Sequence, residues 1–148
     1  MHTSRSWTSL LSAAALAMAA VTGISACSST SPPASSSVAA TGAHMSATEF
    51  STAMKAPGTV VLDVRTPAEF AAGHLPNAKN IDIEGPDFAS GIAALDKTAP
   101  YAVYCRSGNR SATAMEQMTA ASFTHVYDLA GGISAWQSMG GPMTMGNP

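Results

Sequence analysis

The 148-residue sequence has little charge, few aromatic residues and only two cysteines. Charged side chains make up 11% of the residues, and the formal net charge is -2. This balance argues against a disordered polyelectrolyte and against a nucleic-acid-binding protein, which needs clustered basic residues. Two cysteines are too few for a disulfide scaffold or a four-thiolate zinc site. These shortages leave one small globular domain as the expected folded unit.

No apolar run is long enough to cross a bilayer, but the first 27 residues are typical of an export signal. Arg5 precedes an apolar stretch over residues 10–24, which is about 15 residues long, whereas a spanning helix needs roughly 20. The segment ends in Ile-Ser-Ala-Cys, with small residues directly before Cys27. This ending resembles the lipobox of bacterial lipoproteins. The alternative is an ordinary secretory signal in which Cys27 has no role.

The lipobox resemblance implies that residues 1–26 are a lipoprotein signal peptide and that Cys27 is lipidated. The chain would then be exported to the cell envelope, anchored to the outer face of the cytoplasmic membrane or in the periplasm. Residues 27–45 are rich in Ser, Pro and Ala and have almost no charge, so we predict a disordered tether. The folded domain is predicted over residues 46–141, followed by a flexible tail over residues 142–148.

Strand and helix patterns alternate along the predicted domain. Continuous apolar runs predict buried strands, and two capping boxes, Ser46 to Glu49 and Thr66 to Glu69, predict helix starts. Four strands are expected over residues 59–63, 79–83, 101–104 and 125–129. Helices are expected from residue 46 to about 55, after residue 66, around residues 88–95, over 111–121 and up to Trp136. The alternation predicts an α/β domain with a mostly parallel central sheet flanked by short helices.

The chemically informative segment is Cys-Arg-Ser-Gly-Asn-Arg-Ser over residues 105–111, between a predicted strand and a predicted helix. Ligands bind at the carboxyl ends of strands in such sheets. A loop that turns into a helix start directs backbone N–H groups inward and favours an anion. These amides, together with Arg106 and Arg110, would stabilise a Cys105 thiolate and make it nucleophilic. The alternative is a buried structural cysteine at a strand end.

The same residues resemble the active-site loop of rhodanese-like domains, which are sulfurtransferases. Residues 63–78 and 131–136 are similar to two further signatures of that family, in the same order along the chain. The resemblance implies a rhodanese-like three-layer domain with Cys105 as the catalytic residue. It places the substrate beside the loop, whose members are Arg106, Ser107, Gly108, Asn109, Arg110 and Ser111. Arg65 is expected either to bind the anionic substrate as well or to form a surface ion pair. Asp63 and His74 are expected to support the loop, with packing as the simpler role of His74.

Loop length distinguishes two chemistries on this scaffold. Related phosphatases and arsenate reductases use a seven-residue loop that is wide enough for a tetrahedral oxyanion. Here Arg110 is five residues after Cys105, and the shorter loop resembles the sulfurtransferase type. The implied reaction is a double displacement, in which the Cys105 thiolate takes the outer sulfur of thiosulfate or a similar donor. The resulting persulfide passes that sulfur to cyanide or to a thiol acceptor.

Three functions from different classes stay open at this point. They are a turnover sulfurtransferase, a persulfide carrier that serves a membrane partner, and a non-catalytic anion-binding module, which the intact Cys105 argues against. The expected partners are a small-molecule sulfur donor, a thiol acceptor, the membrane through the lipid, and a protein that supplies or removes sulfur. We predict no cofactor and no metal site, because the scattered methionines, including Met143 and Met145, form no ligand cluster.

Overall fold

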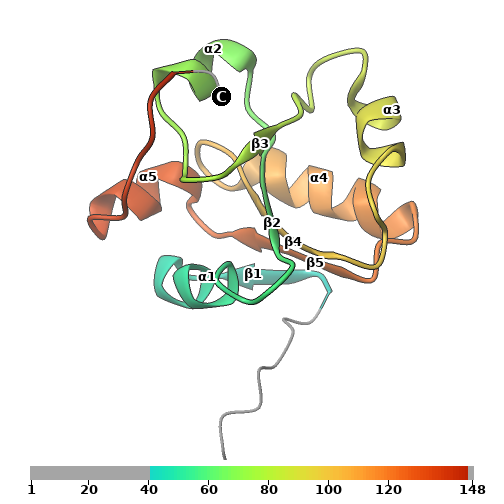
Figure 1. Cartoon of the computed structure of the whole chain (residues 1–148), viewed down its shortest axis with the longest axis horizontal. Helices are drawn as coiled ribbons and strands as arrows, with labels where there is room; N and C mark the ends of the chain where they lie inside the picture. Colours follow the sequence, from blue (N-terminus) through green and yellow to red (C-terminus); the bar gives the residue numbers. More distant parts are fainter. Residues whose placement is uncertain (1–40, 147–148) are drawn as a thin grey trace, which may run out of the picture. The chain divides into compact units, whose positions relative to one another are not determined.

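The structure is a computed structural model that describes residues 41–146. A five-stranded sheet with the order β1-β5-β4-β2-β3 forms its centre, and every neighbouring pair of strands is parallel (Figure 1). The predicted α/β domain with a parallel sheet is therefore confirmed. The strands are β1 (Ala43–Met45), β2 (Val60–Asp63), β3 (Lys79–Asn80), β4 (Pro100–Tyr104) and β5 (His125–Leu129). The helices are α1 (Ala47–Ala53), α2 (Pro67–Ala72), α3 (Phe88–Ala93), α4 (Asn109–Ala120) and α5 (Gly132–Ser138).

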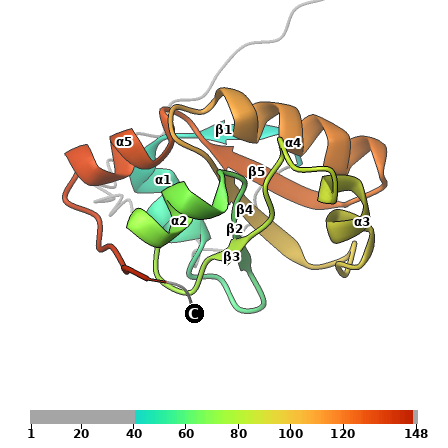
Figure 2. The same ribbon diagram turned by 90° about the horizontal axis from the view of Figure 1, so that it is seen from above.

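The helices cover both faces of the sheet and make three layers. Figure 2 shows α3 and α4 on one side and α1, α2 and α5 on the other. Alternating side chains of the buried strands supply both cores, because successive residues of a strand point to opposite faces. Val103 packs under α3 and α4, whereas its neighbours Ala102 and Tyr104 pack under the other three helices. Cys105, the residue that follows β4, belongs to the core under α3 and α4.

Both capping boxes form as predicted, and they fix where α1 and α2 begin. The Ser46 side chain accepts from the Glu49 amide, and the Glu49 carboxylate accepts from the Ser46 amide at 2.9 Å. Thr66 and Glu69 make the same pair of bonds at the start of α2, with Pro67 in the first helical turn. These side chains satisfy N–H groups that have no partner within the helix.

The sheet includes one strand that the sequence does not predict. Ala43–Met45 pairs in parallel with Tyr127 to Leu129 of β5, so the sheet begins within the segment assigned to the tether. Conversely, β3 is a two-residue strand rather than the expected strand over residues 79–83. Both are edge strands, and their extent depends on hydrogen bonds to a neighbouring strand rather than on their own apolar pattern.

The segment that follows α5 is held against the domain as far as residue 146, although we expected a flexible tail from residue 142. Thr144 and His74 exchange two backbone hydrogen bonds of 2.8 Å, and the Gly146 amide donates to the Ala71 carbonyl. The Trp136 indole N–H also donates to the Pro142 carbonyl at 2.9 Å. These hydrogen bonds explain why the tail is ordered as far as residue 146. The flexible tail was expected from composition, which indicates only the local conformational preference of a segment.

The predicted signal peptide, Cys27 and most of the tether lie outside the described residues. Between residues 41 and 146, no helix combines the length and the apolar character needed to span a membrane.

Candidate active site

Cys105 immediately follows β4 and lies at the carboxyl edge of the sheet. It is buried, with 0% of its surface exposed. Its carbonyl accepts a 2.8 Å hydrogen bond from the Ile133 amide at the start of α5. Its Sγ atom accepts from the Gly108 amide at 3.1 Å. The sheet, the loop and the helix that follows β5 therefore fix this residue together.

Gly108 allows the loop to turn back over the sulfur. It is the N-cap of α4 and has φ 103°, in the region where side-chain-bearing residues are strained. A Cβ atom there would also lie 3.2 Å from the Gly131 nitrogen. From the sequence we expect several amides between residues 106 and 111 to face the sulfur. Among the described hydrogen bonds, the Gly108 N–H alone reaches Sγ, at the positive end of a 12-residue helix.

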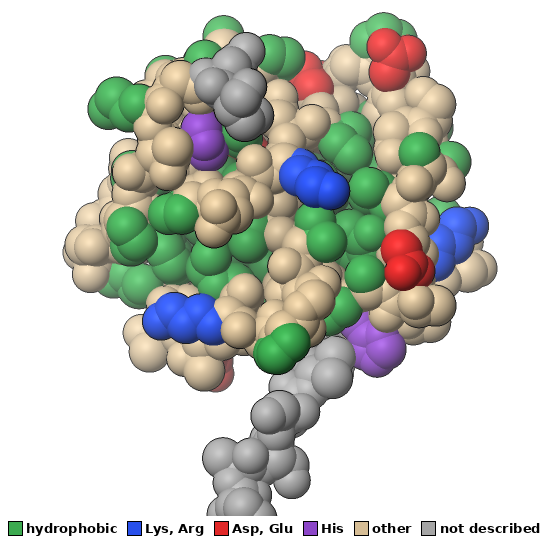
Figure 3. All heavy atoms as spheres, in the orientation of Figure 1, with side chains coloured by type: hydrophobic (Ala, Val, Ile, Leu, Met, Phe, Trp, Pro, Cys, Tyr) green, Lys and Arg blue, Asp and Glu red, His purple; other side chains and the backbone are tan. Residues whose placement is uncertain are grey.

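Arg106 is the cation of the loop that is available to a ligand. Its side chain is exposed, and no carboxylate of the described residues lies within salt-bridge distance of it. Its carbonyl accepts from both the amide and the hydroxyl of Ser134. Ser107 and Asn109 are also exposed. On the face that Figure 3 shows, Lys and Arg side chains are separated from one another and form no basic patch.

Arg110 connects the end of the loop to two acidic residues. Its two terminal nitrogens donate to the two carboxylate oxygens of Glu69 at 2.9 Å each, and Nη1 also donates to Glu84 at 2.9 Å. The hydrogen bonds from Arg110 lower the pKa of Glu69 to about 2, and those from Thr66 add to the effect. Because its charge is engaged by two carboxylates, Arg110 fixes the loop against α2.

Arg65 is buried and paired, rather than part of a surface ion pair. Its Nε and Nη2 atoms donate to both oxygens of Asp63, the shortest contact being 2.6 Å, and Nη2 also donates to the Gly73 carbonyl at 2.7 Å. The guanidinium carbon lies 5.6 Å from the centre of the Tyr104 ring. Asp63 also accepts from the Arg65 amide. This arrangement orients Arg65, so that Asp63 supports an arginine beside the loop rather than the loop itself.

Ser111 completes the loop through a buried carboxylate. Its hydroxyl lies 2.9 Å from the Gly108 carbonyl and 2.9 Å from Oδ2 of Asp128 on β5. The other oxygen of Asp128 pairs with His44 of β1 at 2.7 Å. A buried charge requires such partners. The N-terminal edge strand is thereby connected to Ser111, the last residue of the candidate loop.

His74 lies against α2 and the tail. Its ring stacks on Phe70 with 3.8 Å between ring centres, its Nδ1 lies 3.0 Å from the Phe70 carbonyl, and its backbone pairs with Thr144. None of the described hydrogen bonds of His74 goes to residues 105–111. Packing is thus the observed role of this histidine.

Three contributions to the site are absent from the sequence predictions. Asp128 binds Ser111, Glu84 binds Arg110, and Gly132 packs its Cα against the loop backbone. The role of Asp128 could have been inferred from the sequence, because an acidic residue within the apolar strand 125–129 requires a buried hydrogen-bond partner. The sequence identifies Glu69 only as a helix cap, because no local pattern relates Glu69 to Arg110, 41 residues later.

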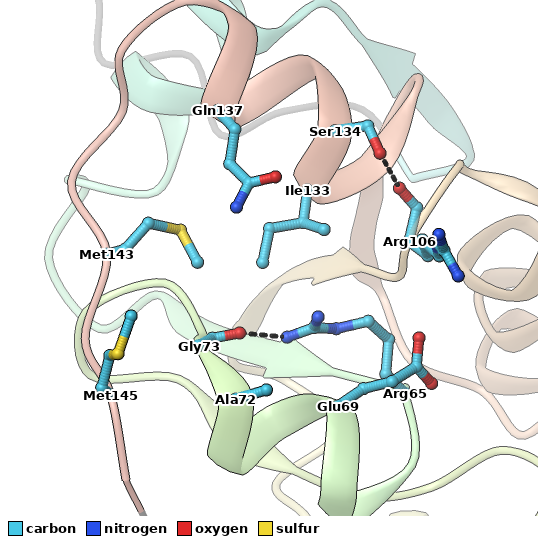
Figure 4. Close-up of a pocket in the computed structure, with 10 residues that line it drawn as sticks. All are labelled: Arg65, Glu69, Ala72, Gly73, Arg106, Ile133, Ser134, Gln137, Met143 and Met145. Atoms are coloured by element: carbon cyan, nitrogen blue, oxygen red, sulfur yellow. Dashed lines mark hydrogen bonds between the residues drawn. The ribbon is translucent and has the colours of Figure 1, made fainter.

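A pocket of about 360 Å³ borders the loop (Figure 4). Arg106 lies at one side of it and Arg65 lines another wall. Ile133 of α5 and Met143 and Met145 of the tail are among its apolar lining residues. Within residues 41–146, no group of three or more His, Cys, Asp or Glu side chains is arranged to hold a metal ion.

Comparisons with known proteins agree with this geometry. Residues 46–139 match the rhodanese-like domain family, and the chain therefore belongs to that family. It is 37% identical over 90 residues to the thiosulfate sulfurtransferase GlpE of Pseudomonas entomophila (strain L48), covering 61% of this chain and 81% of that protein. The match to the protein of the same name from Pseudomonas aeruginosa (strain LESB58) is 39% over 82 residues, covering 55% and 73%. The chain is thus an enzyme of the rhodanese type, and its curated relatives are sulfurtransferases.

Solved structures show the same fold. The crystal structure of a rhodanese-related protein from Thermoplasma volcanium is 32% identical, with a TM-score of 0.63, and the match covers 70% of this chain and 98% of that one. A rhodanese-like domain protein from Staphylococcus aureus matches with 27% identity and a TM-score of 0.57, covering 64% and 90%.

Proposed function

We propose that this enzyme transfers a sulfane sulfur from thiosulfate, or a similar anionic donor, to a thiol or cyanide acceptor through a persulfide on Cys105. The observation that carries the proposal is the Gly108 amide directed at Sγ at 3.1 Å, at the start of α4. A backbone N–H at the positive end of a helix can donate a hydrogen bond to an anionic sulfur. The names of the curated relatives support thiosulfate as the donor.

The reaction consists of two displacements at sulfur. In the first, the Cys105 thiolate attacks the outer sulfur of thiosulfate, a new S–S bond forms, and sulfite leaves with the electron pair of the broken bond. In the second, cyanide or a thiolate attacks the outer sulfur of the persulfide, and the Cys105 thiolate is regenerated. No net oxidation takes place, and no general base is needed when the thiol is already ionised.

Arg106 is the residue that we assign to the donor's charge. Arg65 and Arg110 are engaged by carboxylates, whereas Arg106 is exposed and has no carboxylate partner in the described part of the chain. A thiosulfate dianion beside Arg106 gains a charge-assisted hydrogen bond without first breaking an ion pair. Arg65 and Arg110 act mainly by holding the site's walls, and both contribute positive potential near the loop.

The buried sulfur requires the loop to open. Cys105 has 0% exposed surface, while the neighbouring side chains of Arg106 and Ser107 are exposed. A donor therefore reaches Sγ when residues 106 and 107 shift away from it. Helix α4 stays in place while residues 106 and 107 shift, because Arg110 is bound to Glu69 and Ser111 to Asp128.

The decisive test is thiocyanate release from thiosulfate and cyanide by the full chain carrying Cys27→Ser, in which Cys105 is the remaining thiol. We expect turnover, and we expect Cys105→Ser in the same background to abolish it. Persulfide on Cys105 without thiocyanate release would instead identify the carrier function. Turnover that survives Cys105→Ser would overturn the proposal.

For the N-terminal segment, we infer export and lipidation at Cys27. The basis is the sequence alone, namely a short apolar stretch that ends in small residues and a cysteine. The inference predicts that labelled fatty acid is incorporated into the chain expressed in a lipoprotein-processing bacterium and that Cys27→Ser prevents incorporation. Incorporation that is unchanged in Cys27→Ser, or no incorporation into either chain, would contradict it.

A further inference from the structure

His44 on β1 lies directly opposite Asp128 on β5 in the parallel register of the two strands. The Nδ1 atom of His44 is 2.7 Å from Oδ1 of Asp128, and the Nδ1–H group is the donor because a carboxylate only accepts. The two side chains differ in exposure, with 59% of the His44 side chain exposed against 1% for Asp128. A residue at the surface thus supplies a hydrogen bond to a carboxylate in the interior.

The Asp128 carboxylate has one other side-chain partner among the described hydrogen bonds, the Ser111 hydroxyl, which lies 2.9 Å from Oδ2. No Lys or Arg side chain within residues 41–146 lies at salt-bridge distance from it. A buried carboxylate needs hydrogen bonds in place of the water that it has lost. If the bond from His44 is removed, Asp128 therefore depends more strongly on the proton of Ser111.

The Ser111 hydroxyl has a single proton and two acceptors, because Oδ2 of Asp128 and the Gly108 carbonyl each lie 2.9 Å from it. Loss of the bond from β1 would draw this proton towards Asp128 and weaken the bond to the carbonyl. That carbonyl also accepts from the Ala112 amide at 3.0 Å, so it is the point where the loop joins α4. On the other side of the same residue, the Gly108 amide donates to the Cys105 sulfur at 3.1 Å. The direction of this amide thus depends on how its residue is held.

We propose that His44 is a positioning residue for sulfur transfer. It acts through Asp128 and Ser111 and keeps the Gly108 amide directed at the sulfur. The proposal rests on the function proposed above, and it gives β1, at the edge of the sheet (Figure 1), a role in that function. His44 does not line the pocket beside the loop, so its effect is expected in kcat rather than in the KM for the donor.

The test replaces His44 in the full chain carrying Cys27→Ser and measures thiocyanate release from thiosulfate and cyanide. We expect His44→Ala to lower kcat about five- to tenfold and to leave the thiosulfate KM within about twofold. His44→Asn is expected to keep kcat within about twofold of the parent value, because the asparagine amide nitrogen is bonded to Cγ, as Nδ1 is. His44→Gln places its amide one methylene farther out and is expected to behave like His44→Ala.

A double variant distinguishes positioning from a general structural effect. If His44 acts through the Ser111 hydroxyl, adding His44→Ala to Ser111→Ala is expected to change kcat by less than about twofold. His125→Ala is the matched control, because the described hydrogen bond of the His125 ring joins it to the neighbouring Thr124, and kcat is expected to be unchanged. Losses that multiply in the double variant, an unchanged kcat in His44→Ala, or a loss in His44→Asn equal to that in His44→Ala would overturn the proposal.

Hydrogen exchange of the Gly108 amide tests the role of His44 without turnover. We expect this amide to exchange at least about fivefold faster in His44→Ala than in the parent, and at close to the parent rate in His44→Asn. Equal exchange in the parent and in His44→Ala would show that His44 does not position the amide. If the parent does not turn over thiosulfate through Cys105, the proposed function fails instead, and the exchange rates still show whether His44 holds the loop.

Discussion

The hydroxyl of Ser111 lies 2.9 Å from Oδ2 of Asp128, a carboxylate that is only 1% exposed. Because the same hydroxyl lies 2.9 Å from the Gly108 carbonyl, it joins β5 to the residue whose amide meets the Cys105 sulfur. The geometry of the loop over residues 105–111 thus depends on the Asp128 carboxylate.

Ser111→Ala is expected to lower the free energy of unfolding by about 1–3 kcal/mol, because it removes a hydrogen-bond partner of a buried carboxylate. Urea denaturation measures the effect, and the Cys105-dependent rate is expected to fall as well. Thr113→Ala, at an exposed position of the same helix, serves as the control and is expected to change stability little. Equal stabilities of the two variants would show that the Ser111–Asp128 bond does not hold the loop.

Glu69→Gln tests the ion pair between Glu69 and Arg110 through the pH dependence of the free energy of unfolding. The pKa of Glu69 is lowered to about 2 from its ordinary 4.5 by hydrogen bonds from Arg110. A lowered pKa in the folded state means that the stabilisation is complete above pH 4.5 and is lost as the pH falls towards 2. The stability difference between parent and variant is therefore expected to be about 0.5–1 kcal/mol at neutral pH and to shrink over that acidic interval.

Glu49→Gln is the matched control, because Glu49 caps α1 in the same way and its pKa is lowered by bonds to Ser46 rather than by an arginine. Glutamine preserves both capping boxes, so the two variants differ in the loss of the Arg110 partner. A stability difference for Glu69→Gln that stays constant from neutral pH to pH 2 would show that the Glu69–Arg110 ion pair does not stabilise the fold.

Gly132→Ala is expected to damage both stability and activity. The added Cβ would lie 2.5 Å from the Cys105 carbonyl oxygen and 2.5 Å from the Arg106 carbonyl carbon, and φ is +59°. Overpacking against backbone together with the left-handed conformation is expected to cost about 3 kcal/mol. Gly58→Ala is the control, because Gly58 has φ +81° but nothing within 4 Å. Similar thermal unfolding of both variants would show that the close approach is unimportant.

Ser122→Gly is expected to stabilise the protein. Ser122 follows the end of α4 with φ 70°, and the Phe123 amide donates to the Met118 carbonyl across it. Glycine adopts this conformation without the strain that serine carries, and a gain of about 0.5–1 kcal/mol is expected. Ser138→Gly, in the last turn of α5, is expected to destabilise instead. A loss of stability in Ser122→Gly would show that the backbone of Ser122 is not strained at its positive φ.

Local patterns in the sequence predict much of the fold. The apolar runs that became β2, β4 and β5 are buried on both faces, and such strands have a continuous hydrophobic signature. Both capping boxes specify helix starts through side chains three residues apart. The candidate loop over residues 105–111 can also be predicted from local sequence, because Cys105, Gly108 and the start of α4 are neighbours in the chain.

The features that the sequence did not predict are contacts between residues that lie far apart in the chain. His44 in β1 meets Asp128, which lies 84 positions later, and the tail at Thr144 pairs with His74. The sequence is compatible with Arg65 in a surface ion pair or in the anion site, and only the fold shows that Asp63 and the Gly73 carbonyl bind it in the interior. No periodicity in a single sequence encodes such contacts.

The most direct test of the central claim is the intact mass of the Cys27→Ser chain after brief exposure to thiosulfate, followed by mapping of the modified peptide. We predict an increase equal to the mass of one sulfur atom on Cys105, its removal by cyanide with release of thiocyanate, and no change in Cys105→Ser. An unchanged mass in the parent chain, or sulfur gained without Cys105, would contradict sulfur transfer through this residue.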